Sequence, residues 1–172
     1  MWSGPASILA GAICDLSLPD HRGRVFRFAD HADRTLIVVF VRGHWCPYCR
    51  RYLGKLQSHL SAFVQRGAEV VAISPEPPAT SAALARQLEL TYPILSDIEG
   101  RAIDQFDVRN RFSSSAALLP HASVFVVAPG GSVFFRSIDR NYKKRTTMRA
   151  IARALDDLES GPIESGGAVA GA

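Results

Sequence analysis

The chain contains little cysteine, no long apolar run and no recognisable leader. Three of its 172 residues are cysteines, an odd and low number that argues against the disulfide-rich scaffold of a small secreted protein. The longest strongly apolar run, LIVVFV at residues 36–41, is far shorter than the roughly 20 residues of a membrane-spanning helix. The first ten residues have neither a basic region nor a long apolar region, so we expect no signal peptide and a reducing, cytoplasmic location.

No charge of one sign dominates either. Lys and Arg number 20 against 16 Asp and Glu, with a formal net charge of +4. The chain has no dense basic run with interleaved aromatics and no phosphate-binding glycine loop, so we expect no nucleic-acid or membrane partner and no bound cofactor. The composition, 47% hydrophobic and 21% charged, is that of a globular protein. We expect one domain over residues 1–160 and a disordered, Gly- and Ala-rich tail over residues 161–172.

Apolar patterns alternate between strand and helix periodicity along the chain. The run TLIVVFV at residues 35–41 is short, continuous and rich in β-branched residues, which predicts a strand buried on both faces. Further expected elements are a hairpin within 9–30, strands at 69–74, 93–97, 124–127 and 133–136, and helices from Pro47 to near Gly67 and over 79–89, 101–108 and 146–159. This order predicts an α/β fold with a central mixed β-sheet flanked by helices.

Two of the three cysteines, Cys46 and Cys49, are separated by only two residues, where the buried strand ends and a helix begins. Pro47 suits the first helical position, which places Cys46 at or near the N-cap and Cys49 in the first turn. The unpaired N–H groups and the dipole of a helix N-terminus favour a thiolate over a thiol. Nearby cations add to this effect: Arg42, Arg50 and Arg51. The pattern is typical of a nucleophilic thiolate with a second sulfur in reach.

The pair has two other readings, a buried core pair and a zinc site. Two buried core cysteines would need no function, and a zinc site would need four ligands. The pair with His44 or His59 is incomplete, and no second Cys-x-x-Cys exists, so we expect no metal. Cys14 is expected to be a buried apolar residue rather than a partner thiol.

The motif Trp45-Cys46-Pro47-Tyr48-Cys49 resembles the Trp-Cys-x-x-Cys active site of thioredoxin-fold proteins, with the Pro-Tyr filling of glutaredoxins. The segments LPDHRG, TLIVVFV, AIS, YPILSD and VFVVAPGG are similar, in order, to peroxiredoxins of the alkyl hydroperoxide reductase/thiol-specific antioxidant group. The resemblance implies a thioredoxin-like fold and a thiol-dependent peroxidase. It further implies a hydroperoxide substrate, a Cys46/Cys49 dithiol–disulfide cycle, and reduction by a thioredoxin-like protein or a small thiol.

The sequence departs from the group's Pro-x-x-x-Thr-x-x-Cys pattern. With Cys49 at the peroxidatic position, Arg42 takes the Pro position, Cys46 the Thr position, and Ala122 that of the active-site arginine. Three arginines are candidate substitutes: Arg42, Arg136 and Arg140. This register makes Cys49 the attacking sulfur, whereas the capping argument and the thioredoxin similarity favour Cys46, which we expect to attack.

Two alternative functions remain open at this point. One is a thiol–disulfide oxidoreductase without a peroxide step. The other is a non-catalytic redox sensor or adaptor that contacts a partner through basic residues near the carboxyl terminus, which otherwise form a solvated face: Arg136, Arg140, Lys143, Lys144, Arg145, Arg149 and Arg153. The peroxide, the reductant and the oligomeric state do not follow from the sequence.

Overall fold

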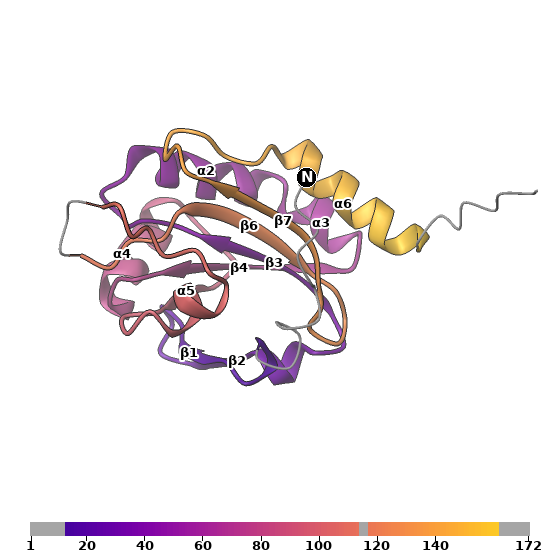
Figure 1. Ribbon diagram of the computed structural model, residues 1–172, viewed down its shortest axis with the longest axis horizontal. Helices are drawn as coiled ribbons and strands as arrows, with labels where there is room; N and C mark the ends of the chain where they lie inside the picture. The colour runs from indigo at the N-terminus through magenta and orange to yellow at the C-terminus, as the bar shows by residue number, and fades with distance from the viewer. Residues whose placement is uncertain (1–12, 114–116, 162–172) are drawn as a thin grey trace, which may run out of the picture.

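The fold is built on a five-stranded mixed sheet with the strand order β5-β4-β3-β6-β7 (Figure 1). The computed structural model describes residues 13–113 and 117–161. Strands β3 (Thr35–Phe40), β4 (Ala68–Ser74) and β5 (Ile94–Ser96) run parallel. Strand β6 (Ala122–Val127) is antiparallel to β3, and β7 (Val133–Asp139) is antiparallel to β6. The predicted α/β fold with a central mixed sheet is therefore confirmed.

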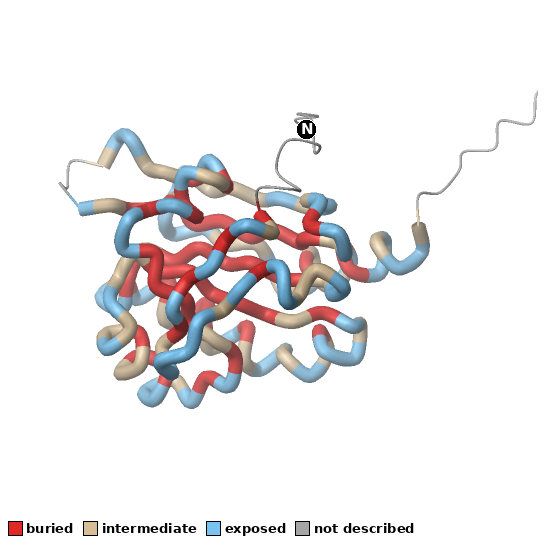
Figure 2. Tube along the Cα trace, turned by 90° about the horizontal axis from the view of Figure 1, so that it is seen from below, coloured by how far each residue is buried: buried red, intermediate tan, exposed pale blue. Residues whose placement is uncertain are grey.

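Helices cover both faces of this sheet. Along β3, Ile37 and Val39 face one apolar cluster, whereas Leu36, Val38 and Phe40 face the other, because successive side chains of a strand point to opposite faces. Helices α2 (Pro47–Ser58), α3 (Leu60–Val64), α4 (Pro78–Gln87) and α6 (Met148–Ser160) contribute to the first cluster. Helix α5 (Arg101–Gln105) and the 3-10 helix η1 (Phe28–His31) contribute to the second. Figure 2 shows the buried positions concentrated along the central strands.

The predicted amino-terminal hairpin is formed by β1 (Ser17–Pro19) and β2 (Val25–Arg27), a separate two-stranded sheet. The helix expected from Pro47 to Gly67 is instead two helices, with a break at His59 (φ −106°, ψ 3°). The Ser58 hydroxyl donates to the Lys55 carbonyl (2.8 Å), and the His59 ring lies 2.9 Å from the same oxygen. The Lys55 carbonyl is thus shared by these side chains and by the His59 N–H (3.2 Å), and this sharing accompanies the break.

The remaining elements agree with the sequence to within a few residues. Helix α6 begins after Thr147, whose side chain accepts a hydrogen bond from the Ala150 N–H (3.1 Å). The expected tail lies outside the described residues except for Gly161, so the domain boundary at residue 160 and the tail's disorder stay predictions.

Candidate active site

The cysteine pair lies at the carboxyl end of β3, where the chain turns into α2. Cys46 is the N-cap residue of α2 and Pro47 the first helical residue, as the sequence predicts. The Cys46 N–H donates to the Gly43 carbonyl (3.2 Å), which fixes the turn. Both sulfurs are free thiols, and the two residues are only 1% and 0% exposed. The structure therefore places both predicted residues in one helical turn, largely shielded from water.

The Cys46 thiol is biased toward ionisation. Burial by itself raises its pKa, but the backbone amides of Cys49 and Tyr48, the Cys49 thiol and the Arg145 guanidinium outweigh burial, and the pKa lies below its ordinary value. The Cys46 side chain makes no capping hydrogen bond of normal geometry. The amides therefore act on the sulfur as the positive ends of dipoles rather than through one aligned bond.

The Cys49 thiol is biased the other way. Burial raises its pKa, and the neighbouring Cys46 sulfur adds to the rise. The Arg42 N–H (3.4 Å) and the Arg145 guanidinium (3.2 Å) both reach the Cys49 Sγ, and they only partly compensate. Cys46 therefore loses its proton first, while Cys49 stays a thiol with two donors beside it.

Arg145 brings a guanidinium to the site from the loop between β7 and α6. Its Nη2 lies 3.2 Å from the Cys49 Sγ, and its Nη1 donates to the carbonyls of Tyr142 and Lys144. These carbonyls orient the side chain, and its Nε is buried without a hydrogen-bond partner. Sequence reasoning placed Arg145 only in the basic carboxyl-terminal group, because 96 residues separate it from Cys49 and no local pattern links the two.

Arg42 brings a second guanidinium group to the site. Its guanidinium carbon lies 5.0 Å from the centroid of the Trp45 ring and 4.7 Å from that of Tyr142, a pair of cation–π contacts. Its Nε is also buried without a partner. Trp45 is 51% exposed, so this stacked group forms the outer surface beside Cys46.

The three arginines suggested as substitutes for the group's active-site arginine have different positions. Ala122, which occupies that position in the sequence, lines a small cavity of about 40 Å³ together with Arg42 and Arg140. Arg136 lies on the edge strand β7, opposite Phe125. Of these three, Arg42 both lines the cavity and donates its N–H to a sulfur.

His44 is held by a glutamate that the sequence analysis missed. Glu76 accepts the His44 N–H (2.8 Å), and its Oε1 lies 2.5 Å from the His44 Nδ1. A Cβ on Gly43 would collide with the Trp45 indole and come within 2.9 Å of the Glu76 Oε1. Glu76 follows β4 as His44 follows β3, and the carboxyl ends of adjacent parallel strands lie at the same edge of a sheet. From this rule, the sequence could have predicted that Glu76 lies near His44.

The other candidates lie away from the site. Cys14 is half-buried in the layer of the second apolar cluster, where it lines a cavity with Phe28 and Leu36. His59 ends α2, far along the helix from its cysteines. Within residues 13–113 and 117–161, no group of three or more His, Cys, Asp and Glu side chains is arranged to hold a metal ion. No helix in these ranges is long and apolar enough to cross a membrane.

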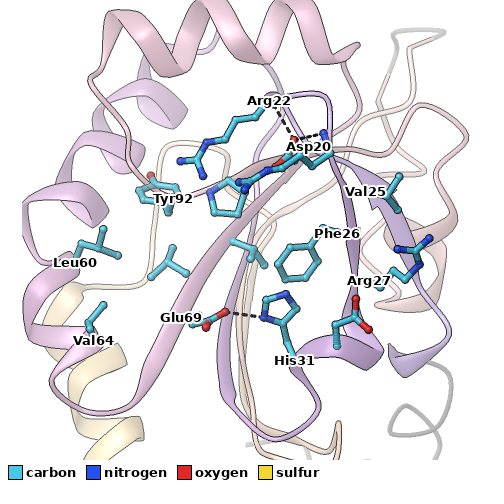
Figure 3. Close-up of a pocket in the computed structure, with 15 residues that line it drawn as sticks. Asp20, Arg22, Val25, Phe26, Arg27, His31, Leu60, Val64, Glu69 and Tyr92 are labelled. Carbon is cyan, nitrogen blue, oxygen red and sulfur yellow. Dashed lines mark hydrogen bonds and ion pairs between the residues drawn. The ribbon is translucent and has the colours of Figure 1, made fainter.

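A cavity of about 400 Å³ lies apart from the cysteine site (Figure 3). It lies between the β1–β2 hairpin, α3 and β4, and its β4 residues, Glu69–Val71, come from that strand's amino-terminal half. Its three arginines are matched by three carboxylates, and Asp20 forms an ion pair with Arg24, while the Glu69 carboxylate is hydrogen-bonded to the His31 ring (2.8 Å). No cysteine lines it.

The chain is similar in sequence to known peroxiredoxins. A candidate peroxiredoxin of Mycobacterium tuberculosis is 35% identical over 81 residues, covering 47% of this chain and 52% of that protein. The chloroplastic peroxiredoxin Q of Gentiana triflora is 28% identical over 120 residues, covering 68% and 52%. The chain thus spans about half the length of these curated relatives.

Solved structures share the fold. Peroxiredoxin Q of Xanthomonas campestris superimposes with a TM-score of 0.74 at 21% identity, over 85% of this chain and 92% of the other. The predicted thioredoxin-like fold is therefore confirmed. Residues 10–136 match the model of the AhpC/TSA family, which covers most of the chain. The chain belongs to the AhpC/TSA family, the peroxiredoxin group that its motifs resemble.

Proposed function

We propose that the protein is a thiol-dependent peroxidase that reduces hydroperoxides through Cys46 and Cys49. The observation that carries this proposal is the opposite bias of the two sulfurs: an N-cap thiol with a lowered pKa lies one turn from a thiol with a raised pKa. The first suits a nucleophile and the second suits a resolving thiol, because thiolate formation controls cysteine reactivity. Family membership supports the same chemistry.

The proposed cycle balances as follows. The Cys46 thiolate attacks the distal oxygen of the hydroperoxide, the O–O bond breaks, and the leaving alkoxide takes a proton and departs as an alcohol. Cys46 is then a sulfenic acid. The Cys49 sulfur attacks the Cys46 sulfur, the S–O bond breaks, and water leaves as the Cys46–Cys49 disulfide forms. An external dithiol of a thioredoxin-like protein, or two molecules of a small thiol, reduces this disulfide by exchange and leaves as the oxidised disulfide.

The two arginines have distinct roles in this proposal. Arg145 stabilises negative charge on the Cys49 sulfur, both when Cys49 attacks and when it leaves during disulfide reduction. Arg42, beside Ala122 and stacked on Trp45, supplies the positive charge that the missing family arginine would supply to the peroxide. A reducing cytoplasm is the proposed setting, since free thiols persist there.

A second candidate is thiol–disulfide exchange without a peroxide step. It is favoured by the exposed Trp45 beside Cys46, a surface on which a protein disulfide could dock, and by Cys46 at the position of the group's threonine. The test compares two reactions of the same protein: consumption of hydrogen peroxide or tert-butyl hydroperoxide with a thioredoxin system, and reduction of insulin disulfides by dithiothreitol. Peroxide turnover above the background of a Cys46→Ser/Cys49→Ser variant supports the peroxidase. Insulin reduction without peroxide turnover rejects it in favour of the exchange reaction.

A further inference from the structure

A basic pocket adjoins the cysteine site, where it could hold part of a substrate of the reaction proposed above. It has a volume of about 260 Å³ and lies between α2 and the loop that precedes α6, two segments that run side by side in Figure 1. Its lining residues are Tyr48, Arg51, Tyr52, Lys55, Lys143 and Arg145. The four from α2 are spaced i, i+3, i+4 and i+7, so they share one face of the helix.

The positive charge of this pocket is not compensated by the protein. Four of the six lining residues are cations and none is a carboxylate. In the described part of the chain, none of these four cations forms an ion pair. Other surface arginines do, such as Arg66 with Asp156 and Arg109 with Asp104. The cations therefore face one another across a space that no acidic side chain fills.

This arrangement also works against the stability of α2. Arg51 follows the first turn of α2, which contains no acidic residue to offset its charge, whereas Lys55 lies in the last turn, where the macrodipole favours a cation. Arg51 and Lys55 form a like-charge pair at i, i+4, which is destabilising in a helix. Local conflicts of this kind concentrate at functional sites, and an anion bound between these residues would relieve this repulsion.

One lining residue connects the pocket to the reacting sulfurs. Arg145 lines the pocket and places its Nη2 3.2 Å from the Cys49 Sγ. The Tyr52 hydroxyl donates to the Thr146 carbonyl (2.8 Å), which fixes the adjacent loop against α2. An anion in the pocket is therefore positioned by the same loop that orients the guanidinium at Cys49.

The volume limits the size of the occupant. A water molecule takes about 30 Å³ of liquid, so the pocket admits a carboxylate with a short carbon chain. We propose that this pocket binds the carboxylate of a small organic substrate, and that the protein prefers carboxylate-bearing substrates to their neutral counterparts. Such a carboxylate belongs either to the hydroperoxide or to the thiol reductant. The substrate preference rests on the function proposed above, whereas the binding of a carboxylate in the pocket does not.

Binding is tested first with a probe that cannot react. Hexanoate and neutral hexanamide are titrated into the reduced protein, and amide chemical shifts are followed by NMR. We expect saturable shifts in α2 and the loop over 140–147 with hexanoate and none with hexanamide. A Lys55→Met/Lys143→Met variant should bind hexanoate roughly three- to tenfold more weakly. Lys144→Met, an exposed neighbour outside the pocket, is the matched control and should bind as the original chain does.

Two kinetic arms then distinguish the source of the carboxylate. In the oxidation arm, a tertiary alkyl hydroperoxide with a terminal carboxylate is compared with its methyl ester. In the reduction arm, 3-mercaptopropionate is compared with its methyl ester, each rate being normalised to thiolate concentration. In one of the two arms the acid should react faster than its methyl ester, and this difference should shrink in Lys55→Met/Lys143→Met. That arm shows whether the carboxylate belongs to the hydroperoxide or to the thiol reductant.

Three results would overturn the inference. They are hexanoate-induced shifts that do not saturate, a loss of hexanoate affinity in Lys144→Met equal to that in Lys55→Met/Lys143→Met, or equal rates for the acid and its methyl ester in both kinetic arms. Rapid, salt-sensitive reduction by an acidic protein without hexanoate binding would likewise reject it in favour of a protein partner. Hexanoate binding without any peroxide consumption would instead reject the proposed function and support the pocket as an anion site.

Discussion

At the scale of single residues, Cys46 and Cys49 have the same chemistry and different surroundings. Cys46 lies before the first helical N–H groups, whereas Cys49 lies within the turn and is fully buried. The pKa of Cys46 is lowered in spite of its burial, whereas the pKa of Cys49 is raised because of its burial. The two roles proposed above follow from the position of each cysteine in the helix together with its burial and the charge of Arg145.

The assignment of the nucleophile predicts the behaviour of two single variants. After one equivalent of peroxide, Cys49→Ser should carry a trapped sulfenic acid on Cys46, because the resolving sulfur is absent. Cys46→Ser should carry none, since a serine hydroxyl is not ionised near neutral pH. A dimedone-type probe with mass spectrometry makes the measurement, and alkylation of Cys46 should saturate at a lower pH than that of Cys49.

The peroxiredoxin register predicts the opposite labelling. Label on Cys49 in Cys46→Ser, with none on Cys46 in Cys49→Ser, would exchange the two roles. The donation by Arg145 to Cys49 would then stabilise the attacking thiolate directly.

Arg145 is expected to affect the sulfurs through its charge. Arg145→Met removes a charged hydrogen bond to sulfur, an interaction worth about 1.5–3 kcal/mol. The rate of disulfide formation should therefore fall roughly tenfold or more, and the alkylation profile of Cys46 should shift to higher pH. Stopped-flow tryptophan fluorescence and iodoacetamide kinetics measure these effects. Arg145→Lys, which retains the charge, should recover part of the rate of disulfide formation and part of the shift in the Cys46 alkylation profile. An unchanged alkylation profile in Arg145→Met would show that Arg145 does not act on the sulfurs.

At the scale of elements, the loop over 140–147 acts as a strap across the first two turns of α2. It is held by the Tyr52 hydroxyl on the Thr146 carbonyl, by Arg145 on Cys49, and by the edge-to-face contact of Tyr48 with Tyr142 (5.7 Å). Both cysteines are buried, and Arg145 of this loop contacts the Cys49 sulfur. Reaction with a large partner therefore requires the strap or the first turn of α2 to open.

Tyr52→Phe tests the strap. Loss of one hydrogen bond to a loop carbonyl should lower the free energy of unfolding by about 1 kcal/mol, and it should speed alkylation of Cys49 because the strap opens more often. Denaturant titration and alkylation rates measure the two effects.

Tyr92→Phe is the matched control for this experiment. Tyr92 is similarly buried and donates to the Leu53 carbonyl (2.8 Å) of the same helix, away from the strap. It should lose comparable stability with no change in Cys49 alkylation. Equal acceleration in both variants would mean that global stability, rather than the strap, controls access.

At the scale of the whole molecule, stability should decrease as pH falls from about 7 toward 5. Burial, followed by the charge of Arg22, lowers the pKa of His21, and burial lowers that of His121. Because each folded-state pKa lies below the unfolded value near 6.5, the unfolded chain binds more protons in this window. Protonation would also remove the acceptor that His21 Nδ1 offers to the Ile94 N–H (3.0 Å), which links the hairpin turn to β5.

Urea unfolding at a series of pH values measures this dependence. His21→Gln keeps an acceptor that does not titrate, so its stability should vary less between pH 7 and 5 than that of the original chain. A stability that rises on acidification in this window would contradict the prediction.

The sequence by itself determined the order of elements, the α/β class and the cysteine pair, and its resemblance to the peroxiredoxin group implied the thioredoxin-like fold. The first three follow from interactions within a few residues: the continuous apolar run at residues 35–41, the turn between β1 and β2, and Pro47 at the first position of α2. Periodicity and capping are local, so a single sequence contains them.

Only the tertiary structure decided what surrounds the sulfurs. Arg145 reaches Cys49 from 96 residues away, and Glu76 reaches His44 from 32 residues away. Both contacts depend on loops that follow strands. Such contacts are set by the order of strands in the sheet and by the path of each loop, which no local pattern of residues specifies.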